Sequence, residues 1–306
     1  MNQHAQWDIV TGVGITALGV AAGRAIETHR PDALVNDPYA ESFVHAARSP
    51  VPMPTRPYAN EDPAIPWASM ATYMGVRSRF FDEYFTSASA AGIDQVVLLA
   101  AGLDARAFRL DWRAGTTVYE LDAPKVLRFK DDVLTEQGAQ PRCHRCTVAV
   151  DLRKDWPAAL RQAGFHPGRP TAWLAEGLLP FLPDDAKDHL FAQVNELSAA
   201  GSQIAVEHID GDVATLLREP MFQNMARRFG FDMAELWPGD QHCDPAAWLA
   251  GHGWMVCTAR ATDVARRYRR PLDEMIRQPM RSSLLITARA EGQRAQQAEG
   301  QQAAGR

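Results

Sequence analysis

The stretch Gln95-Val-Val-Leu-Leu-Ala-Ala-Gly-Leu-Asp-Ala-Arg106 decides the fold of this 306-residue chain. A short apolar run leads directly into the small residues Ala100, Ala101 and Gly102, and a helical segment follows. In open α/β sheets, small residues at this point let backbone amides approach a ligand at the carboxyl end of the first strand. The stretch therefore predicts a buried first strand, a tight turn and a ligand site beside it.

Beyond Asp94, short apolar runs alternate with helical segments, which is typical of βαβ units in a parallel sheet. We expect a doubly wound, mostly parallel α/β sheet of the Rossmann-like type. Its seven strands are expected at Gln95–Ala100, Thr116–Glu120, Cys146–Val150, Thr171–Ala175, Gln203–Glu207, Trp254–Ala259 and Ser283–Ala288. The segment Arg260–Arg281 carries no long helix pattern, so the last two strands are expected to form an antiparallel pair at the sheet edge.

A helical cover is expected before the α/β domain, over residues 1–92. Apolar residues recur at helical spacing in Val13–Glu27, Asp37–Ala47 and Ser69–Ala91. Between the second and third of these helices, Ser49–Pro66 contains six prolines, which forbid regular structure. A compact domain keeps a loop of this length mainly for function, so it is a candidate cover for an active site.

The α/β domain is expected over residues 93–290, with an insertion at 209–245. The insertion carries large apolar residues, which could pack helices together or form the apolar wall of a substrate pocket. These residues are Met221, Phe222, Met225, Phe231, Met233 and Trp237. The insertion and the Pro-rich loop together are expected to cover the substrate site. The tail, 291–306, is rich in Gln, Ala and Gly and is expected to be disordered.

The composition is that of a globular protein with a large core, since 46% of the residues are hydrophobic and 23% are charged. The formal charge of -5 is spread over interspersed acids and bases, so no strong field would attract nucleic acid or an anionic membrane. The apolar stretch Ile9–Ile26 has no basic segment before it and contains Arg24, unlike an export signal. We expect a cytoplasmic protein with a small-molecule partner, of unknown oligomeric state.

Two short strings resemble motifs but lack the context that those motifs need. Gly12-Val-Gly-Ile-Thr-Ala17 matches a dinucleotide-binding pattern, yet no buried strand precedes it, so nicotinamide binding is not expected. Cys143 and Cys146 form a CxxC pair, but a zinc site needs a second pair at similarly tight spacing. The adjacent His242 and Cys243 cannot easily supply two tetrahedral ligands, so we expect no metal.

Acidic residues follow three further strands of the predicted sheet. Glu120 and Asp122 end the second strand about 20 residues after the first turn, where an acid usually accepts ribose hydroxyls. Asp151 follows the third strand and Glu176 follows the fourth. Asp122 could instead cap a helix that begins at Pro124, and both roles are compatible. The ligand site is therefore expected to extend along the carboxyl edge of the sheet.

Several motifs in this order resemble the leucine carboxyl methyltransferase family, especially its actinobacterial branch of S-adenosylmethionine-dependent methyltransferases. The resemblance extends from about Asp37 to His208. It rests on RSRFFDEYF (77–85), VVLLAAGLDARAFRL (96–110), VYELDAPKVLRFK (118–130), VAVDLRKDWPAAL (148–160) and AEGLLPFLP (175–183). The resemblance implies the class I methyltransferase fold, with S-adenosylmethionine as the cofactor.

Three residues would hold the methionine end of the cofactor if the resemblance is carried over position by position. Arg77 would hold the methionine carboxylate, a task suited to a planar, bidentate cation. Gly102 would pass the backbone beneath this moiety. Glu176 would lie near the amino group.

The nucleoside end of the cofactor is implied to contact the second and third strand ends. Asp122 matches the acid of the family that binds the ribose, with Glu120 as a nearby second carboxylate. Asp151 and the backbone amide of Leu152 match the adenine contacts.

Two departures from the family pattern concern the backbone and the acceptor. Ala100 stands where many members have glycine, which is a minor change if this residue has a negative φ. Asn36 precedes Asp37, whereas members that methylate a protein C-terminus carry a lysine at that point. Other members resemble carboxyl O-methyltransferases of polyketide acids. The resemblance therefore implies O-methylation of a carboxylate on a small molecule, polyketide-like or another secondary metabolite.

The acceptor decides whether the reaction needs a general base. A carboxylate is already ionised at neutral pH and needs none, whereas a phenol or alcohol needs one. His208, directly after the fifth strand, is the candidate base in the second case, although a histidine there could equally be a structural residue. A catalytically inactive protein that binds S-adenosylmethionine is a further alternative, since it would keep the same cofactor residues.

Overall fold

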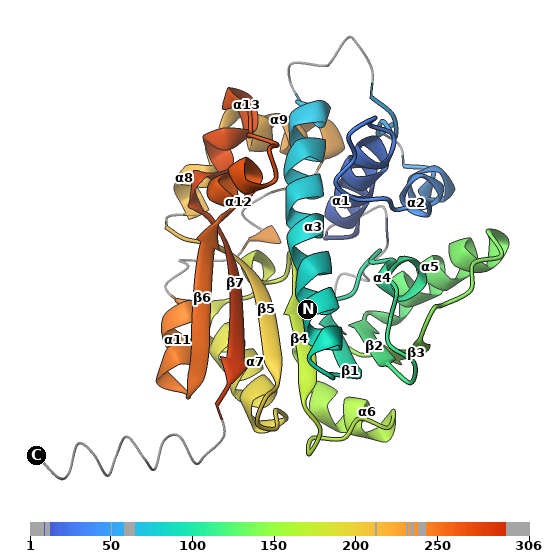
Figure 1. Ribbon diagram of the computed structural model, residues 1–306. Helices are drawn as coiled ribbons and strands as arrows, with labels where there is room; N and C mark the ends of the chain where they lie inside the picture. Colours follow the sequence, from blue (N-terminus) through green and yellow to red (C-terminus); the bar gives the residue numbers. More distant parts are fainter. Residues whose placement is uncertain are drawn as a thin grey trace, which may run out of the picture.

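The computed structural model describes residues 9, 13–49, 51–57, 65–211, 213–230, 232, 236–237 and 243–291. Its sheet has the strand order β3-β2-β1-β4-β5-β7-β6 (Figure 1). The strands are β1 (Gln95–Leu99), β2 (Thr117–Asp122), β3 (His144–Ala149), β4 (Thr171–Ala175), β5 (Gln203–Ile209), β6 (Trp254–Arg260) and β7 (Ser283–Ala290). The seven-stranded, mostly parallel sheet expected from the sequence is confirmed.

The antiparallel pair expected at the sheet edge is also present. β7 runs antiparallel to both β5 and β6, while the other paired strands are parallel. β7 lies between β5 and β6, so β6 forms the edge of the sheet. The connection from β6 to β7 contains only α12 (Ala261–Arg267), α13 (Glu274–Arg277) and the 3-10 helix η2 (Pro279–Ser282).

Helices cover both faces of the sheet, and a buried apolar cluster lies on each side (Figure 1). One face carries α1 (Val13–Thr28), α2 (Ala40–Ala47), α3 (Trp67–Ala90), α4 (Arg106–Arg109) and α5 (Pro124–Glu136). The other carries α6 (Trp156–Gln162), α7 (Asp184–Glu196) and α11 (Pro245–Gly251). Because they are covered on both faces, β1 and β4 are buried at every position, which explains their continuous apolar runs.

The three cover helices expected from the sequence are present as α1, α2 and α3, with ends shifted by a few residues. The largest shift is at α2, which begins at Ala40 instead of Asp37. The Asp37 carboxylate accepts hydrogen bonds from Tyr39 N (3.1 Å) and from Arg24 Nε (2.8 Å). These bonds hold Asp37 outside the helix and tie it to α1.

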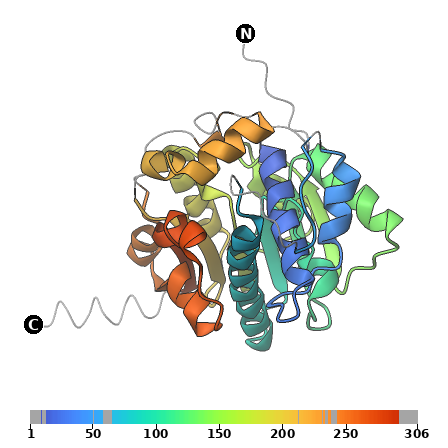
Figure 2. The same ribbon diagram turned by 90° about the horizontal axis from the view of Figure 1, so that it is seen from above.

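The insertion between β5 and β6 forms α8 (Val213–Leu217) and α9 (Pro220–Phe229). Seen from above, α1 and α9 both lie over the upper end of the sheet (Figure 2). Within the Pro-rich loop, Met53 and Ile65 are buried in the apolar cluster on the α3 face. Residues 58–64, Phe231, Met233 and the tail from 292 lie outside the described residues.

Neither the glycine-containing string at the start of α1 nor the CxxC pair has the geometry of the motif that it resembles. Gly14 is buried within α1, not in a turn after a strand, and Gly12 lies outside the described residues. The Cys143 and Cys146 thiols lie near Ala107 O (3.7 Å) and Ala163 O (3.8 Å), in contact with the apolar clusters on opposite faces of the sheet. The two thiols therefore do not converge on a common point.

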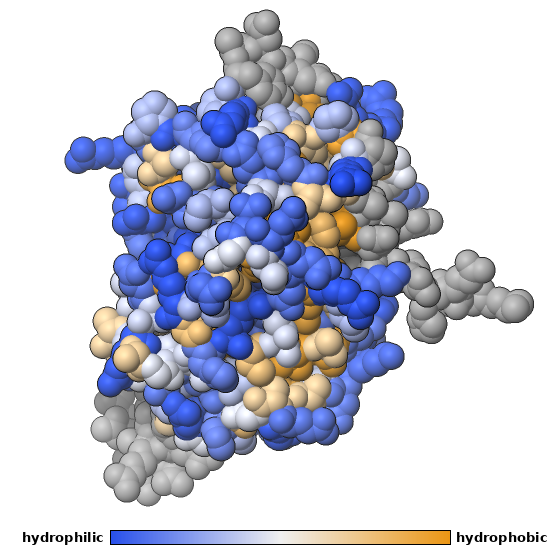
Figure 3. Space-filling view, turned by 90° about the vertical axis from the view of Figure 1, so that its right-hand side faces the viewer, coloured by the Kyte–Doolittle hydropathy of each residue, from blue (hydrophilic) through white to orange (hydrophobic). Residues whose placement is uncertain are grey.

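In the described part of the chain, no helix is long and apolar enough to cross a membrane. Hydrophilic side chains cover most of the face that carries α2, α5 and α6, and hydrophobic ones gather in patches toward one side (Figure 3).

Helices α1 and α3 pack closely because each has a glycine at the contact. A Cβ added to Gly75 would lie 2.7 Å from Cδ of Glu27, and one added to Gly23 would lie 2.8 Å from Cγ of Met74. Glu27 is fully buried and forms an ion pair with Arg270 at 3.2 Å. The Glu27 side chain therefore cannot easily move away from a larger residue at position 75.

We predict that Gly75→Ala lowers the free energy of unfolding by about 2 kcal/mol, because overpacking a buried contact outweighs the better helix propensity of alanine. Urea unfolding measures the difference. Gly251→Ala in α11 is the matched control, since a Cβ there meets no atom within 4 Å. Equal unfolding midpoints for Gly75→Ala and the wild type would contradict the prediction and show that the Glu27 side chain moves aside without a loss of stability.

Candidate active site

A cavity of about 1040 Å³ lies at the carboxyl ends of β1 to β5. It is placed at the point where the strand order reverses between β1 and β4, which is where open α/β sheets bind ligands. Single ligand pockets of proteins hold about 300–1,000 Å³. The cavity therefore has room for a cofactor and a second molecule.

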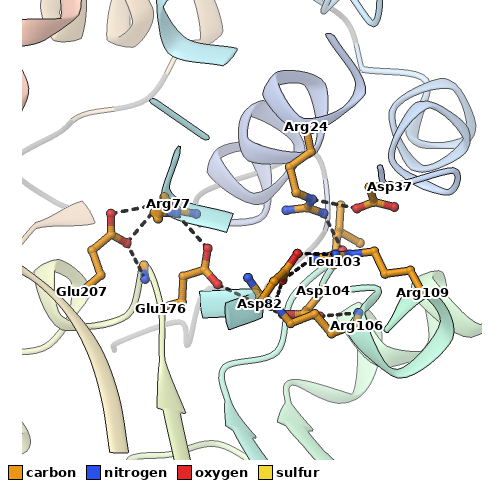
Figure 4. A network of polar contacts seen from close by, with 11 residues as sticks. Arg24, Asp37, Arg77, Asp82, Leu103, Asp104, Arg106, Arg109, Glu176 and Glu207 are labelled. Carbon is orange, nitrogen blue, oxygen red and sulfur yellow. Dashed lines mark hydrogen bonds and ion pairs between the residues drawn. The ribbon is translucent and has the colours of Figure 1, made fainter. Parts of the chain in front are cut away.

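Arg77 of α3 lies at the centre of the polar part of the cavity. Its Nε donates to Glu176 at 2.8 Å, and its Nη1 donates to Glu207 at 3.0 Å (Figure 4). Burial by itself would lower the pKa of Arg77, but the two carboxylates offset it and the pKa is raised. Arg77 therefore stays charged and fixes the ends of β4 and β5 to α3.

The ion-pair network continues from Glu176 to Arg106 of α4. Arg106 contacts Glu176 at 2.7 Å and Asp82 at 2.7 Å, and it also pairs with Asp104 (Figure 4). Arg109 donates to Asp82 at 2.6 Å. With Arg77 and Glu207, the network joins three arginines to four carboxylates, and all seven side chains are largely buried. It therefore carries one net negative charge beside the cavity.

Arg24 fastens the cover helix α1 to the turn after β1. Its Nη2 donates to Leu103 O at 2.7 Å, while its Nε donates to Asp37 (Figure 4). Arg24 also lines the cavity, together with small residues of the same helix such as Gly14 and Ala17. Gly14, Thr16 and Ala17 of the string that resembles a dinucleotide motif thus line the site from within a helix.

Asp122 is held at the end of β2 by two backbone amides. Gly102 N and Ala123 N donate to its two carboxylate oxygens, each at 2.6 Å. Burial raises the pKa of Asp122, and these two hydrogen bonds oppose the shift. The N-cap position of α5 belongs to Ala123, so Asp122 is not the helix cap. Its carboxylate lines the cavity and is oriented by the turn after β1.

The backbone at Ala100 differs from the expectation. Ala100 has φ 54° and Gly102 has φ 48°, so both residues of the turn lie in the left-handed region. The substitution of glycine by alanine is therefore not minor here, because an L-residue pays about 1–2 kcal/mol for this conformation. The tight turn after β1 is maintained against this strain.

Glu120 does not reach the cavity, contrary to its expected position near the ribose. Its side chain is fully buried and contacts Lys130 of α5 at 2.8 Å and Arg145 of β3 at 2.7 Å. Glu120 lies two residues before the end of β2, and α5 covers it there. Glu120 therefore forms buried ion pairs with a structural role. The acid of β2 that faces the cavity is Asp122.

His208 does not line the cavity either. Successive side chains of a strand point to opposite faces, so Glu207 faces α3 while His208 faces the side of α7. Burial lowers the pKa of His208, and the nearby Lys187 of α7 lowers it further. The structure therefore gives no support to His208 as a general base.

Asp151 and Leu152 lie at the rim of the cavity, at the end of β3. The Asp151 carboxylate forms an exposed ion pair with Arg153 at 2.7 Å. The hydrogen bond from Arg153 is the main reason why the pKa of Asp151 is lowered. The third strand end is thus more open to solvent than the second and the fourth.

The insertion contributes an apolar wall. Met221, Phe222, Met225 and Trp237 line the cavity, which supports the pocket interpretation of these residues. None of the described residues of the Pro-rich loop lines it. Of the two segments expected to cover the substrate site, only the insertion reaches the cavity within the described residues.

Sequence reasoning missed Glu207, which contacts Tyr73 of α3 in the cavity wall. Glu207 accepts hydrogen bonds from Tyr73 Oη (2.6 Å), Gly177 N (2.8 Å) and Arg77. The available signal was that Glu207 ends the fifth strand, as other acids end the second, third and fourth.

Residues 17–195 match the leucine carboxyl methyltransferase family. The chain belongs to this family. It is an S-adenosylmethionine-dependent methyltransferase. A Saccharopolyspora erythraea protein described as "Putative S-adenosyl-L-methionine-dependent methyltransferase" is 49% identical over 288 residues, 94% of this chain and 99% of its own length. A Rhodococcus jostii protein with the same description is 50% identical over 276 residues, 88% of this chain and 92% of its own length.

The fold is shared with a solved structure from Streptomyces avermitilis. The crystal structure of a DUF574 family protein from Streptomyces avermitilis matches with a TM-score of 0.50 and 15% sequence identity. The match covers 89% of this methyltransferase and 96% of that chain. At this identity the likeness concerns the fold alone.

The ion-pair network should also make the free energy of unfolding depend on pH in the acidic range. Asp104 is buried, which by itself would raise its pKa, but Arg106 lowers the pKa to about 2. An aspartate in the unfolded chain has a pKa of about 3.9. The lower pKa of Asp104 in the folded protein therefore adds about 2 kcal/mol to the free energy of unfolding above pH 4, and this contribution is lost as the pH falls toward 2. Urea unfolding of Asp104→Asn should therefore depend less on pH in this range than the wild type, and parallel curves would contradict the assignment.

Proposed function

We propose that this methyltransferase transfers the methyl group of S-adenosylmethionine to a carboxylate of a small molecule. The charge of the site supports binding of the cofactor, because the cofactor carries two cationic groups and one carboxylate. Within the network, Glu176 and Glu207 place carboxylates at the cavity wall that suit the cationic groups, and Arg77 places a guanidinium there that suits the carboxylate. The residues present therefore fit the cofactor.

The residues at the strand ends have the positions that such binding requires. Asp122, already oriented by Gly102 N, would accept hydrogen bonds from the ribose hydroxyls. Glu176 would lie near the amino group and Arg77 near the carboxylate of the methionine moiety. Asp151 and the amide of Leu152, at the rim, would contact the adenine.

The observation that carries the acceptor assignment is that the described lining around Arg77 offers neither a histidine nor an unpaired carboxylate as a base, while Asp122 is held by two backbone amides at the proposed ribose position. None of the cavity's described lining residues is a histidine, and Glu207 and Glu176 are both held by Arg77. Tyr73 is unsuitable, because burial and Glu207 raise its pKa well above the ordinary value and its hydroxyl donates to Glu207. A phenol or alcohol would need a base, whereas a carboxylate would not.

The apolar wall also favours a carboxylate acceptor. When bound, the cofactor supplies an activated methyl group on a cationic sulfonium. Transfer to a carboxylate joins an anion to a cation and leaves two neutral products, so charge disappears on the way to the transition state. A water-poor, apolar cavity favours such a reaction, and the protein contributes alignment and exclusion of water.

We predict that Asp122→Ala weakens S-adenosylmethionine binding by about 10- to 100-fold, the usual effect of losing a hydrogen bond to a charged group. Isothermal calorimetry measures it. Asp111→Ala, which removes an exposed carboxylate from a surface ion pair, is the control and should bind normally. An unchanged affinity in a folded Asp122→Ala protein would refute the ribose assignment.

His208→Gln should retain the turnover number within about twofold and leave the pH–rate profile unchanged, because His208 does not face the cavity. Steady-state kinetics between pH 6 and pH 9 tests this with any acid that is a substrate. A positioned general base contributes about 10²- to 10⁴-fold. A loss of that size would favour a hydroxyl acceptor and a rearranged site.

A further inference from the structure

Five of the eight methionines that the structure describes line the cavity. Two come from α3, two from α9 and one from η2, segments that are far apart in the sequence. Phe222 and Trp237 lie among them, with their ring centroids 5.6 Å apart. We call this group the methionine chamber, and it consists of Met70, Met74, Met221, Met225, Met280, Phe222 and Trp237.

The helical period connects the chamber to the polar part of the cavity. Met70 and Met74 are four residues apart on α3, and Met221 and Met225 are four residues apart on α9, so each pair lies on one face of its helix. Arg77 follows Met74 by three residues on the same face of α3. The chamber therefore begins one helical turn from the guanidinium that holds Glu176 and Glu207.

The chamber is chemically uniform. Arg77 is the single charged side chain that α3, α9, α13 and η2 contribute to the cavity lining within the described residues, and two carboxylates already neutralise it. Three of the five methionines lie beyond residue 195, where the family match ends. This half of the cavity is thus built partly by α3, inside the family match, and partly by α9 and η2, outside it.

Methionine side chains are unbranched and polarizable, and they adapt to ligands of different shape. A surface rich in methionine accepts a range of apolar partners, whereas branched side chains and aromatic slots select one shape. The choice of five methionines therefore indicates a ligand body that is apolar and variable in shape.

We propose that the methionine chamber binds the apolar body of the acceptor, and that the acceptor is an amphiphilic monocarboxylic acid with a long, flexible hydrocarbon portion. This rests on the proposed methylation of a carboxylate. The hydrocarbon portion would fill the chamber, and the carboxylate would lie at its polar end beside the methyl group of the cofactor. Acids of several chain lengths would be accepted.

A polypeptide C-terminus fits the chamber poorly. Each buried peptide unit brings an N–H and a C=O that need partners, and leaving one unpaired costs about 1–3 kcal/mol, or roughly 5- to 150-fold in binding. The chamber side chains supply almost no hydrogen-bonding groups. A hydrocarbon chain, in contrast, makes no such demand.

The test uses the full-length enzyme with S-adenosylmethionine and straight-chain acids from hexanoic to hexadecanoic acid. Methyl ester formation is measured with a labelled methyl group. We expect kcat/KM to rise about fourfold for each buried methylene until the chamber is full, which corresponds to the transfer of one methylene from water. A peptide with a free C-terminal carboxylate is included, and preferential methylation of this peptide would overturn the proposal.

Met225→Gln tests the chamber directly, because it introduces an amide on the half-buried face of a surface helix without changing the length of the side chain. It should raise KM for the long acids by about tenfold, and for hexanoic acid by less, because fewer methylenes are buried. Met275→Gln is the matched control, since Met275 is exposed on α13 and does not line the cavity. Equal effects of the two substitutions would contradict the proposal.

Binding without turnover separates the two proposals. The affinity of each acid is measured by calorimetry in the presence of S-adenosylhomocysteine. Affinity that rises with chain length and is reduced by Met225→Gln, without ester formation, would support the chamber and refute carboxylate methylation. Ester formation that does not depend on chain length would support the reaction and refute the chamber, and the absence of both binding and turnover would refute the chamber as well.

Discussion

The site depends on one shared cation, the buried guanidinium of Arg77. It contacts Glu176 at the end of β4 and Glu207 at the end of β5, while its helix, α3, belongs to the N-terminal cover. Removing one partner of a buried ion pair costs about 3–5 kcal/mol, so each of the three side chains fixes the positions of the other two. The cover is therefore joined to the sheet at the place where the cofactor and the acceptor would meet.

The same helix divides the cavity into two halves. Arg77 and, through Glu176, Arg106 make the half beside the strand ends polar. One turn earlier, Met74 and Met70 begin the apolar half, which α9 completes. A polar half suits a cationic cofactor, and an apolar half suits a methyl transfer in which a cation and an anion become neutral. Because Met74 and Arg77 are three residues apart on α3, the two halves lie next to each other.

The cavity is lined partly by residues inside the family match and partly by residues beyond it. The family match covers residues 17–195, which include the turn after β1, Asp122, Asp151 and Glu176. The walls from α9 and η2 follow later in the sequence. This division is the usual relation between a fold and its functions, in which one scaffold is kept and added segments shape the substrate site.

The sequence by itself determined the sheet, because apolar runs of strand length and small-residue turns are local signals, as in Gln95–Gly102. It also located Asp122 and Glu176, since an acid after a parallel strand lies at the carboxyl edge in any such sheet. Only the tertiary structure decided that α5 buries Glu120, that His208 faces away from the cavity and that Ala100 has a positive φ. The position of Glu120 depends on which helix covers the strand end, and that of His208 depends on which side chains of the strand face which side of the sheet. Contacts between segments that are distant in the sequence set both.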